Sequence, residues 1–590
     1  MDPSPTTTNI SRSRSRRWLP KIAAPAFGVG VDSGRNLIVI ALANLLLFAG
    51  VCLCFRLQYQ TNDDVAMNIY AAGKGLGQPP SEFLLFQHFL LGLILKSLYV
   101  HLPAFPWYGA VTYLYLFVSN LTIGYVILRL YTRCSGLIVW LATFLLFYLS
   151  AIISPQFTIC AGYLAIAGTL LLFATTLRPY TTTTRNVWVL TIASALMVLA
   201  GLVRIYSLAL VLLVMSPLYG YALLRNTRAT LRRLVPAVCL VVMIAVFSQW
   251  WHLAYYRRSP GWRQFYHYNN IRADFIDRGK IAWNKDTQRV CQQVGWSGND
   301  LSMLITWFYV DPKVYSLHNL LFVSEHASSS PQPEIAWHQL VIDLEKCFLS
   351  YGGMAVLVLL VLLVTGGTAM QRWFAVAAVV SSSGICFGID LIERYLPYRV
   401  WIVMLFGLYT MLLGVWGQTS TEGRWPLVVK PIGRKILSFF VGICLATLCI
   451  GEIKRAGEVS NDHKSLQNAF RDDIARLRPQ VDQLFVIWGG DFPFEAYQLP
   501  AQAAPVAAEM QILGLGVGNQ DPYVTNRLKS FGISDLYQAF YNRDDILLIC
   551  NDRKTKMLIR YIWEHYHTPV EIRTVFQGAR FTVRQVRKRI

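Results

Sequence analysis

Two adjacent carboxylates, Asp63 and Asp64, follow the first long apolar run of the chain. That run extends from about residue 37 to residue 55, after a basic segment and before a polar stretch rich in Gly and Pro. Positive charge before a first span holds the N-terminus in the cytoplasm, so the acidic pair is predicted to emerge on the opposite membrane surface. Carboxylates placed there are candidates for general-base work, or for holding a divalent metal, toward a lipid-borne substrate.

Three arginines are predicted to reach the same surface. Arg204 stands at the outer end of one apolar run, and Arg394 and Arg399 flank a proline turn before another. A guanidinium group binds phosphate with a bidentate fork, so all three are candidates to hold a donor phosphate. Each site residue also has a plain structural interpretation. The arginines could be snorkelling or interfacial anchors, and Asp63 could cap the helix that follows it.

Further polar and aromatic residues on the predicted outer loops are candidates to bind a sugar or an acceptor. Rings stack on pyranose faces and polar groups bind hydroxyls, although the same mixture suits a loop that lies on lipid headgroups. These candidates are His88, Gln156, Arg272, Asp274, Trp296 and Asp300. Asp274, Asp277 and Asp300 are also candidates for a second acid.

The composition places the chain among polytopic membrane proteins. It has 590 residues, of which 54% are hydrophobic, and the apolar residues lie in long blocks. The formal net charge of +21 would suit nucleic acid. Much of the excess, however, lies in short loops next to spans, where positive charge sets topology and meets anionic lipid, so no nucleic-acid partner is expected. The first apolar run lacks a small-residue cleavage site and is predicted to be a retained span.

About eleven apolar runs are predicted to cross the bilayer. They start near residues 37, 108, 136, 158, 186, 206, 235, 353, 373, 398 and 436. A further run, Phe83 to Val100, is interrupted by polar residues and is predicted to lie along the surface as an interfacial helix. With that choice the basic loops share one side, the cytoplasm, which puts the N-terminus inside and the C-terminus outside.

The tail of the chain predicts a small α/β domain after the polytopic helical part. Short strands at Leu484 to Trp488, Ile546 to Cys550 and Phe581 to Val586 accompany a helix from Lys554 to His565. Gly514 to Gly518 looks like a phosphate loop but lacks the spacing of one, which favours a tight turn.

The predicted organisation has three parts: a disordered basic cytoplasmic tail (1–35), a transmembrane domain (36–450) with outer loops at 56–107 and 253–352, and an extracytoplasmic α/β domain (451–590). The cysteines number eleven and most fall inside apolar runs. Cys291, Cys347 and Cys550 are predicted to lie outside, where a disulfide among them is one expectation.

The order of these features resembles the GT-C class of membrane glycosyltransferases. That class carries an acidic motif in its first extracytoplasmic loop, then two juxtamembrane helices, then a span that ends in basic residues. Here the order is Asp63-Asp64, a helix near Val65 to Ala72, the segment Phe83 to Val100, and a span ending at Arg129 and Arg133. Four phrases also resemble bacterial GT-C-like proteins of unassigned function: Asn62-Asp63-Asp64, Gln156-Phe157-Thr158, Trp296-Ser297-Gly298-Asn299-Asp300 and Leu396-Pro397-Tyr398-Arg399.

The resemblance implies transfer of a sugar from a polyprenyl-phosphate donor on the outer face of a bacterial inner membrane. The acceptor would be a glycan, a lipid-linked glycan or a protein, and Asp63 or Asp64 would be catalytic. The chain lacks the WWDxG signature of oligosaccharyltransferases and the Asp-Glu opening typical of aminoarabinose and protein mannosyl transferases, which leaves sugar and acceptor open. The alternative functions are a glycolipid transporter or flippase and a non-catalytic membrane scaffold.

Overall fold

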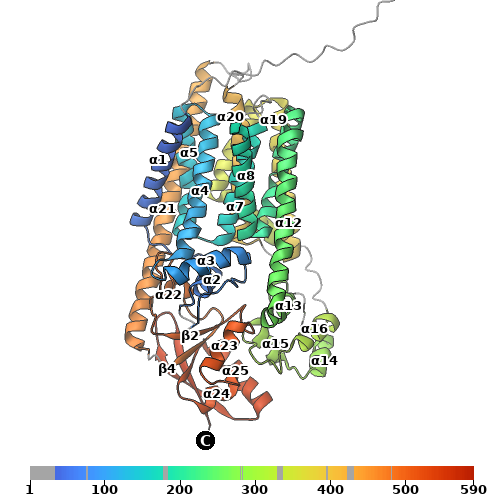
Figure 1. Ribbon diagram of the computed structural model, residues 1–590, viewed down its shortest axis with the longest axis vertical. Coiled ribbons are helices and arrows are strands. Elements are labelled where there is room, and N and C mark those ends of the chain that lie inside the picture. Colours follow the sequence, from blue (N-terminus) through green and yellow to red (C-terminus); the bar gives the residue numbers. More distant parts are fainter. Residues whose placement is uncertain are drawn as a thin grey trace, which may run out of the picture.

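The computed structural model describes residues 33–74, 78–176, 184–279, 281, 283–328, 337–393, 396–421, 431–479 and 482–589. Most of the predicted basic tail, and Arg394, lie outside the described residues. Long helices stand side by side in one body, and a small α/β domain lies at one end of it (Figure 1). The predicted fold class, a polytopic helical membrane protein with a C-terminal α/β domain, is confirmed.

Most of the bundle helices are apolar, and a helix satisfies its backbone hydrogen bonds internally, as spanning segments must. They are α1 (Ser33–Cys54), α4 (Trp107–Leu130), α5 (Arg133–Thr143) continued by η1 (Phe144–Tyr148) and α6 (Leu149–Ile153), α7 (Phe157–Thr176), α8 (Thr184–Val203), α9 (Ile205–Val214), α10 (Ser216–Arg225), α11 (Thr227–Ala229) continued by η2 (Thr230–Leu234) and α12 (Val235–Arg258), α17 (Trp337–Leu349), α18 (Tyr351–Gly366), α19 (Ala369–Glu393), α20 (Tyr398–Thr421) and α21 (Pro431–Leu477).

Within the described ranges, seven helices are long and apolar enough to cross a membrane, or up to nine if each of two bent pairs is one span. The pairs bend by 45° between α9 and α10 and by 82° between α17 and α18. Pro217 at the start of α10 and the Ser350 cap of α18 account for the breaks. The other two predicted runs begin in α8 and α21, so the predicted count of eleven is not confirmed.

Helix α7 is the centre of the bundle. It packs against α4, α8, α9 and α20, and nearly all of its residues are buried. Helices α1 and α12 instead expose many Leu, Ile and Val side chains, as expected for surfaces that face lipid.

Two shorter helices lie across the end of the bundle that faces the α/β domain, α2 (Asn62–Ala72) and α3 (Phe89–His101) (Figure 1). The predicted surface helix begins at Phe89, not at Phe83, because His88 caps it: Nδ1 of His88 accepts the Leu90 N–H at 3.2 Å. Helix α2 ends at Gly73, where φ is +70° and an added Cβ would meet the Gln78 carbonyl oxygen.

The long predicted outer loop is helical rather than extended. It contains α13 (Pro260–Phe275), α14 (Lys285–Gln293), α15 (Gly298–Ile305) and α16 (Leu317–His326), which follow α12 and lie beside the α/β domain (Figure 1). Their apolar residues share a core with that domain.

The C-terminal domain has a five-stranded sheet in the order β2-β1-β3-β5-β4. Strands β1, β2 and β3 are parallel, and β5 is antiparallel to β3 and β4. The elements are β1 (Leu484–Trp488), α22 (Phe494–Tyr497), β2 (Gln511–Leu515), α23 (Pro522–Ser530), α24 (Leu536–Asn542), β3 (Ile546–Ile549), α25 (Asp552–Tyr566), β4 (Val570–Gln577) and β5 (Thr582–Lys588).

Helix α21 runs from the bundle to the α/β domain without a break (Figure 1). The predicted domain boundary at residue 451 falls inside it, so the proposed division of the chain stays a prediction. The α/β domain and α2 touch directly, since the Tyr70 hydroxyl donates to Asp521. Both therefore lie on the same side of the bundle.

We predict that this side is extracytoplasmic, because the basic loops lie at the other end of the predicted spans. An enzyme reporter that works only outside the cytoplasm, fused after Ile590, should be active. The same reporter fused after Thr421, next to the basic segment at 424–435, should be inactive. The reverse pattern would place both Asp63 and the α/β domain in the cytoplasm.

Candidate active site

Asp63 and Arg399 form an ion pair between α2 and the start of α20. Oδ2 of Asp63 lies 3.2 Å from Nη1 of Arg399, and the two side chains are 25% and 33% exposed. Asp63 stands in the first turn of α2 and Arg399 in the first turn of α20. Two of the predicted site residues, far apart in sequence, are therefore brought together and remain accessible.

Asp64 points the other way, into the protein, and is fully buried. Its Oδ1 accepts the Tyr108 hydroxyl at 2.9 Å and the Phe157 N–H at 3.1 Å, and its Oδ2 accepts the Thr61 hydroxyl at 3.2 Å. These bonds tie α2 to α4 and α7. Burial raises the pKa of Asp64 to about 8, although the bond from Tyr108 acts in the opposite direction.

The structure separates the roles of the two acids. The N-cap of α2 is Thr61, so Asp63 is not the cap that its position allowed. The buried Asp64 carboxyl group accepts hydrogen bonds within the fold, whereas the Asp63 carboxylate faces Arg399 and solvent.

Arg204 stands at the break between α8 and α9, close to this ion pair. Its guanidinium lies over the rings of Phe86, Phe157 and Tyr206, at 5.8, 5.6 and 5.2 Å from their centroids. Burial and then the neighbouring Arg399 lower its pKa, and Asp63 acts in the opposite direction. Among the described residues, the Arg204 guanidinium donates no hydrogen bond and forms no ion pair, so its charge is available to an anion.

Glu495 is a site residue that the sequence interpretation missed. It lies on α22, which packs against α2, and it is partly buried. Burial raises its pKa, and the Asp63 carboxylate raises it further, which places the two acids within electrostatic reach. Glu495 follows Asp63 by 432 positions in the sequence, and nothing in the sequence indicates that the two acids lie close together.

Gln156 and His88 support the site without reaching it. Oε1 of Gln156 accepts the Ile159 N–H at 3.0 Å and so caps α7, while the next residue, Phe157, binds Asp64. Both ring nitrogens of His88 are engaged, Nδ1 by the Leu90 N–H and Nε2 by the Ser248 carbonyl at 2.8 Å. Burial lowers the pKa of His88, which favours the neutral ring.

The charged candidates on α13 and just after it form ion pairs within the long loop. Arg272 is buried, binds Asp277 at 3.0 Å and lies over the ring of Trp307. Asp274 pairs with Arg278 in the next turn. The structure therefore uses these side chains inside the long loop and does not bring them to Asp63.

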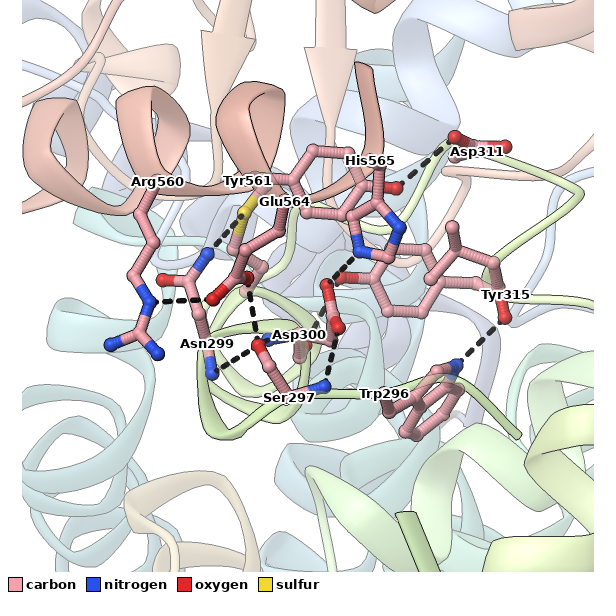
Figure 2. A network of polar contacts seen from close by, with 12 residues as sticks. Trp296, Ser297, Asn299, Asp300, Asp311, Tyr315, Arg560, Tyr561, Glu564 and His565 are labelled. Atoms are coloured by element: carbon pink, nitrogen blue, oxygen red, sulfur yellow. Dashed lines mark hydrogen bonds and ion pairs between the residues drawn. The ribbon is translucent and has the colours of Figure 1, made fainter. Parts of the chain in front are cut away.

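Trp296 and Asp300 join the long loop to the α/β domain, as Figure 2 shows. Asp300 closes a capping box on α15 with Ser297, and its Oδ1 lies 2.8 Å from Nε2 of His565 on α25. Burial acts to lower the pKa of His565, but the Asp300 carboxylate outweighs it and the net direction is upward. Trp296 is buried and donates to the Val314 carbonyl. Both residues hold the loop in place.

Within the described residues, one group of three or more His, Cys, Asp or Glu side chains could hold a metal: Asp300, Glu564 and His565, whose ligand atoms lie within 4.8 Å of one another. The carboxylates of Asp300 and Glu564 already accept bonds from Ser297, and Glu564 also accepts one from Arg560 (Figure 2). The group does not include Asp63 or Asp64, and the three bonds to Asp64 point inward. A metal held by the Asp63-Asp64 pair stays a prediction.

The expectation of a disulfide is wrong. Cys291, Cys347 and Cys550 are buried free thiols, and so are not bridged to one another. Cys347 lies in the core of the helical bundle, whereas Cys291 and Cys550 belong to the core that the long loop shares with the α/β domain.

No protein-family model and no curated protein matches the chain. Two solved structures are similar to it in general arrangement. One is ArnT from Cupriavidus metallidurans bound to undecaprenyl phosphate, with 12% identity, a TM-score of 0.45 and coverage of 94% of this chain and 98% of the other. The other is the apo state of the same protein, with 12% identity, a TM-score of 0.37 and coverage of 92% and 98%. At these values the likeness assigns no residue, substrate or activity to this chain.

The fold and the charged cluster define a class of protein on their own. This is a polytopic membrane protein in which an α/β domain lies against a surface cluster of two arginines and two accessible acids. The cluster comprises Arg204, Arg399, Asp63 and Glu495.

The burial of Asp64 predicts a pH dependence of stability. A carboxyl group with a raised pKa in the folded state keeps its proton longer there than when unfolded, so stability falls as pH rises from about 4 to about 8. Each pH unit in that window costs at most about 1.4 kcal/mol. Asp64→Asn can still accept from Tyr108 and Phe157 but does not titrate.

We expect the thermal unfolding midpoint of Asp64→Asn in detergent to exceed that of the wild type by more at pH 8 than at pH 5. Some pH dependence should remain, because burial also raises the pKa of Asp521, to about 7. An equal difference at both pH values would show that Asp64 does not titrate in this window.

Proposed function

We propose that the protein is a membrane glycosyltransferase that takes a sugar from a polyprenyl-phosphate donor. The transfer would take place on the extracytoplasmic face of a bacterial inner membrane, with a glycan, a lipid-linked glycan or a protein as acceptor. The observation that supports this most is the ion pair of an accessible acid, Asp63, with Arg399 where the membrane helices end, with Arg204 nearby.

The geometry suits a lipid-linked phosphate. Arg204 and Arg399 lie at the ends of apolar helices, the depth at which the phosphate of a lipid would rest while its chain stays among the helices or in the bilayer. Arg204 has no anionic partner of its own and is framed by three rings, a setting in which a cation is weakly hydrated. A phosphate would supply the missing charge through charge-assisted hydrogen bonds.

The acid nearby supplies the second requirement of the reaction. Sugar transfer forms a bond from an acceptor oxygen to the anomeric carbon and breaks the bond from that carbon to the donor phosphate. Asp63 would take the acceptor proton, and the arginines would stabilise the charge on the leaving phosphate.

The burial of Asp64 assigns it a different part in this proposal. Its hydrogen bonds from Tyr108 and Phe157 fix α2 against α4 and α7, so it holds Asp63 in place and does not touch the substrate. In this proposal Asp64 has a structural role and Asp63 has a chemical one.

We predict that Asp63→Asn lowers sugar transfer by about 10²–10⁴-fold, as expected for a lost general base, while folding stays intact. Asp64→Asn should keep transfer within about tenfold of the wild type. The measurement is sugar transfer from lipid extracted from the native membrane, with unfolding midpoints recorded for each variant.

A matched control is Asp286→Asn. Asp286 also stands in the first turn of a helix, α14, and pairs with an arginine, Arg289 at 3.5 Å, but it is far more exposed and lies in the long loop. This variant should be unaffected. Near-wild-type transfer by Asp63→Asn would contradict the proposed function and favour a non-catalytic scaffold.

A further inference from the structure

The α/β domain contacts α2, the helix that carries Asp63 and Asp64. The segment between β2 and α23 reaches α2, and there the Tyr70 hydroxyl donates to Oδ2 of Asp521 at 2.9 Å. Asp521 is fully buried and Tyr70 is 8% exposed. The bond joins residues 451 positions apart, so it is a contact between the domain and the first loop.

The contact is closely packed on every side. The ring of Tyr70 lies 4.3 Å from that of Tyr523, and the Gln78 side chain donates to the Tyr523 carbonyl at 3.0 Å. A Cβ on Gly518 would come within 2.7 Å of the Tyr70 hydroxyl oxygen. The glycine-rich segment therefore serves close packing on α2, which explains glycine at 518 without a phosphate.

Helix α2 is thus fixed at both ends. In its first turn Asp64 is bound by Tyr108 and Phe157, and in its last turn Tyr70 is bound by Asp521. Asp63 lies next to the first of these anchors, and its side-chain direction depends on the axis and rotation of an 11-residue helix. A small rotation of α2 would separate Asp63 from Arg399.

We propose that Asp521 is a positioning residue, which acts through Tyr70 to fix the orientation of α2 that holds Asp63 against Arg399. The proposal rests on the proposed function in one respect, that Asp63 does the chemistry. In this proposal the α/β domain contributes to the reaction by fixing the position of Asp63, which lies outside the domain on α2.

Two single variants remove this bond with little other change. Tyr70→Phe keeps the ring packed against that of Tyr523 and loses only the hydroxyl. Asp521→Asn keeps an oxygen to accept the Val524 N–H, which caps α23, and replaces the oxygen that Tyr70 binds. Because both remove one bond, the double variant should show the same effect as either single variant.

A matched control lies in the same domain. Asp535 also caps a helix, α24, and also accepts a tyrosine hydroxyl, that of Tyr566, but both partners belong to the α/β domain. Asp535→Asn therefore changes the same kind of bond without touching α2.

The experiment is hydrogen exchange of α2 amides in the full-length protein in detergent, together with kcat and KM for sugar transfer. Tyr70→Phe, Asp521→Asn and the double variant should speed exchange in α2 about tenfold or more. They should also lower kcat by about 10–100-fold, the scale of a misplaced catalytic group, and change KM less than about twofold. Asp535→Asn should do neither.

Unchanged exchange in α2 for Tyr70→Phe would overturn the proposal, and so would faster exchange with unchanged kcat. A loss that appears in KM alone would also overturn it, because positioning of Asp63 acts on the chemical step. If the wild-type protein transfers no sugar, the proposed function fails, and the exchange data alone then decide whether Asp521 holds α2.

Discussion

The burial of the Asp64 carboxyl group is the constraint on which the arrangement of the site depends. A carboxyl group removed from water must be satisfied by hydrogen bonds, and its ionised form is strongly disfavoured. Here the donors come from α4, from the start of α7 and from the residue before α2. Meeting that requirement forces α2 to lie across the end of the bundle, with its first turn against α7. Asp63, one residue earlier, is thereby directed toward α20 and Arg399.

The α/β domain completes the same arrangement from the other side. It contacts the far end of α2 through Asp521 and Tyr523, and its helix α22 brings Glu495 toward Asp63. The long loop is joined to the domain in turn by Asp300 with His565 and by a shared apolar core (Figure 2). Loop, domain and α2 thus form one continuous packed layer on a single side of the bundle.

Features that depend on local sequence, above all the long helices, could be predicted from the sequence. Long apolar runs predict helices, and the runs starting at residues 37, 108 and 158 correspond to α1, α4 and α7. The sequence predicts that Asp63 and Arg399 emerge on one surface, but their ion pair is known only from the structure. The predicted runs at residues 186 and 436 begin in α8 and α21, which are not among the candidate spans of the described residues, so the predicted number of spans is not confirmed.

Other features depend on tertiary contacts. Strand β2 is apolar, but it runs into the glycine-rich segment through Gly514, which favours a turn in the sequence. Strand β4 is half exposed and charged, so it carries no apolar pattern. Asp300 and Arg272 have the residue types of a sugar site, yet their partners, His565 and Asp277, engage them inside the fold. The proximity of Glu495 to Asp63 arises only because α22 packs on α2.

The central claim is that a lipid-linked phosphate binds at Arg204 and Arg399, beside Asp63. The most direct test is an experimental structure of the full-length protein in lipid nanodiscs with a polyprenyl phosphate added at saturating concentration. The account predicts phosphate oxygens within hydrogen-bond distance of at least one of the two guanidinium groups, on the same side as the Asp63 carboxylate. A phosphate bound away from both arginines, or an empty site at saturation, would contradict it.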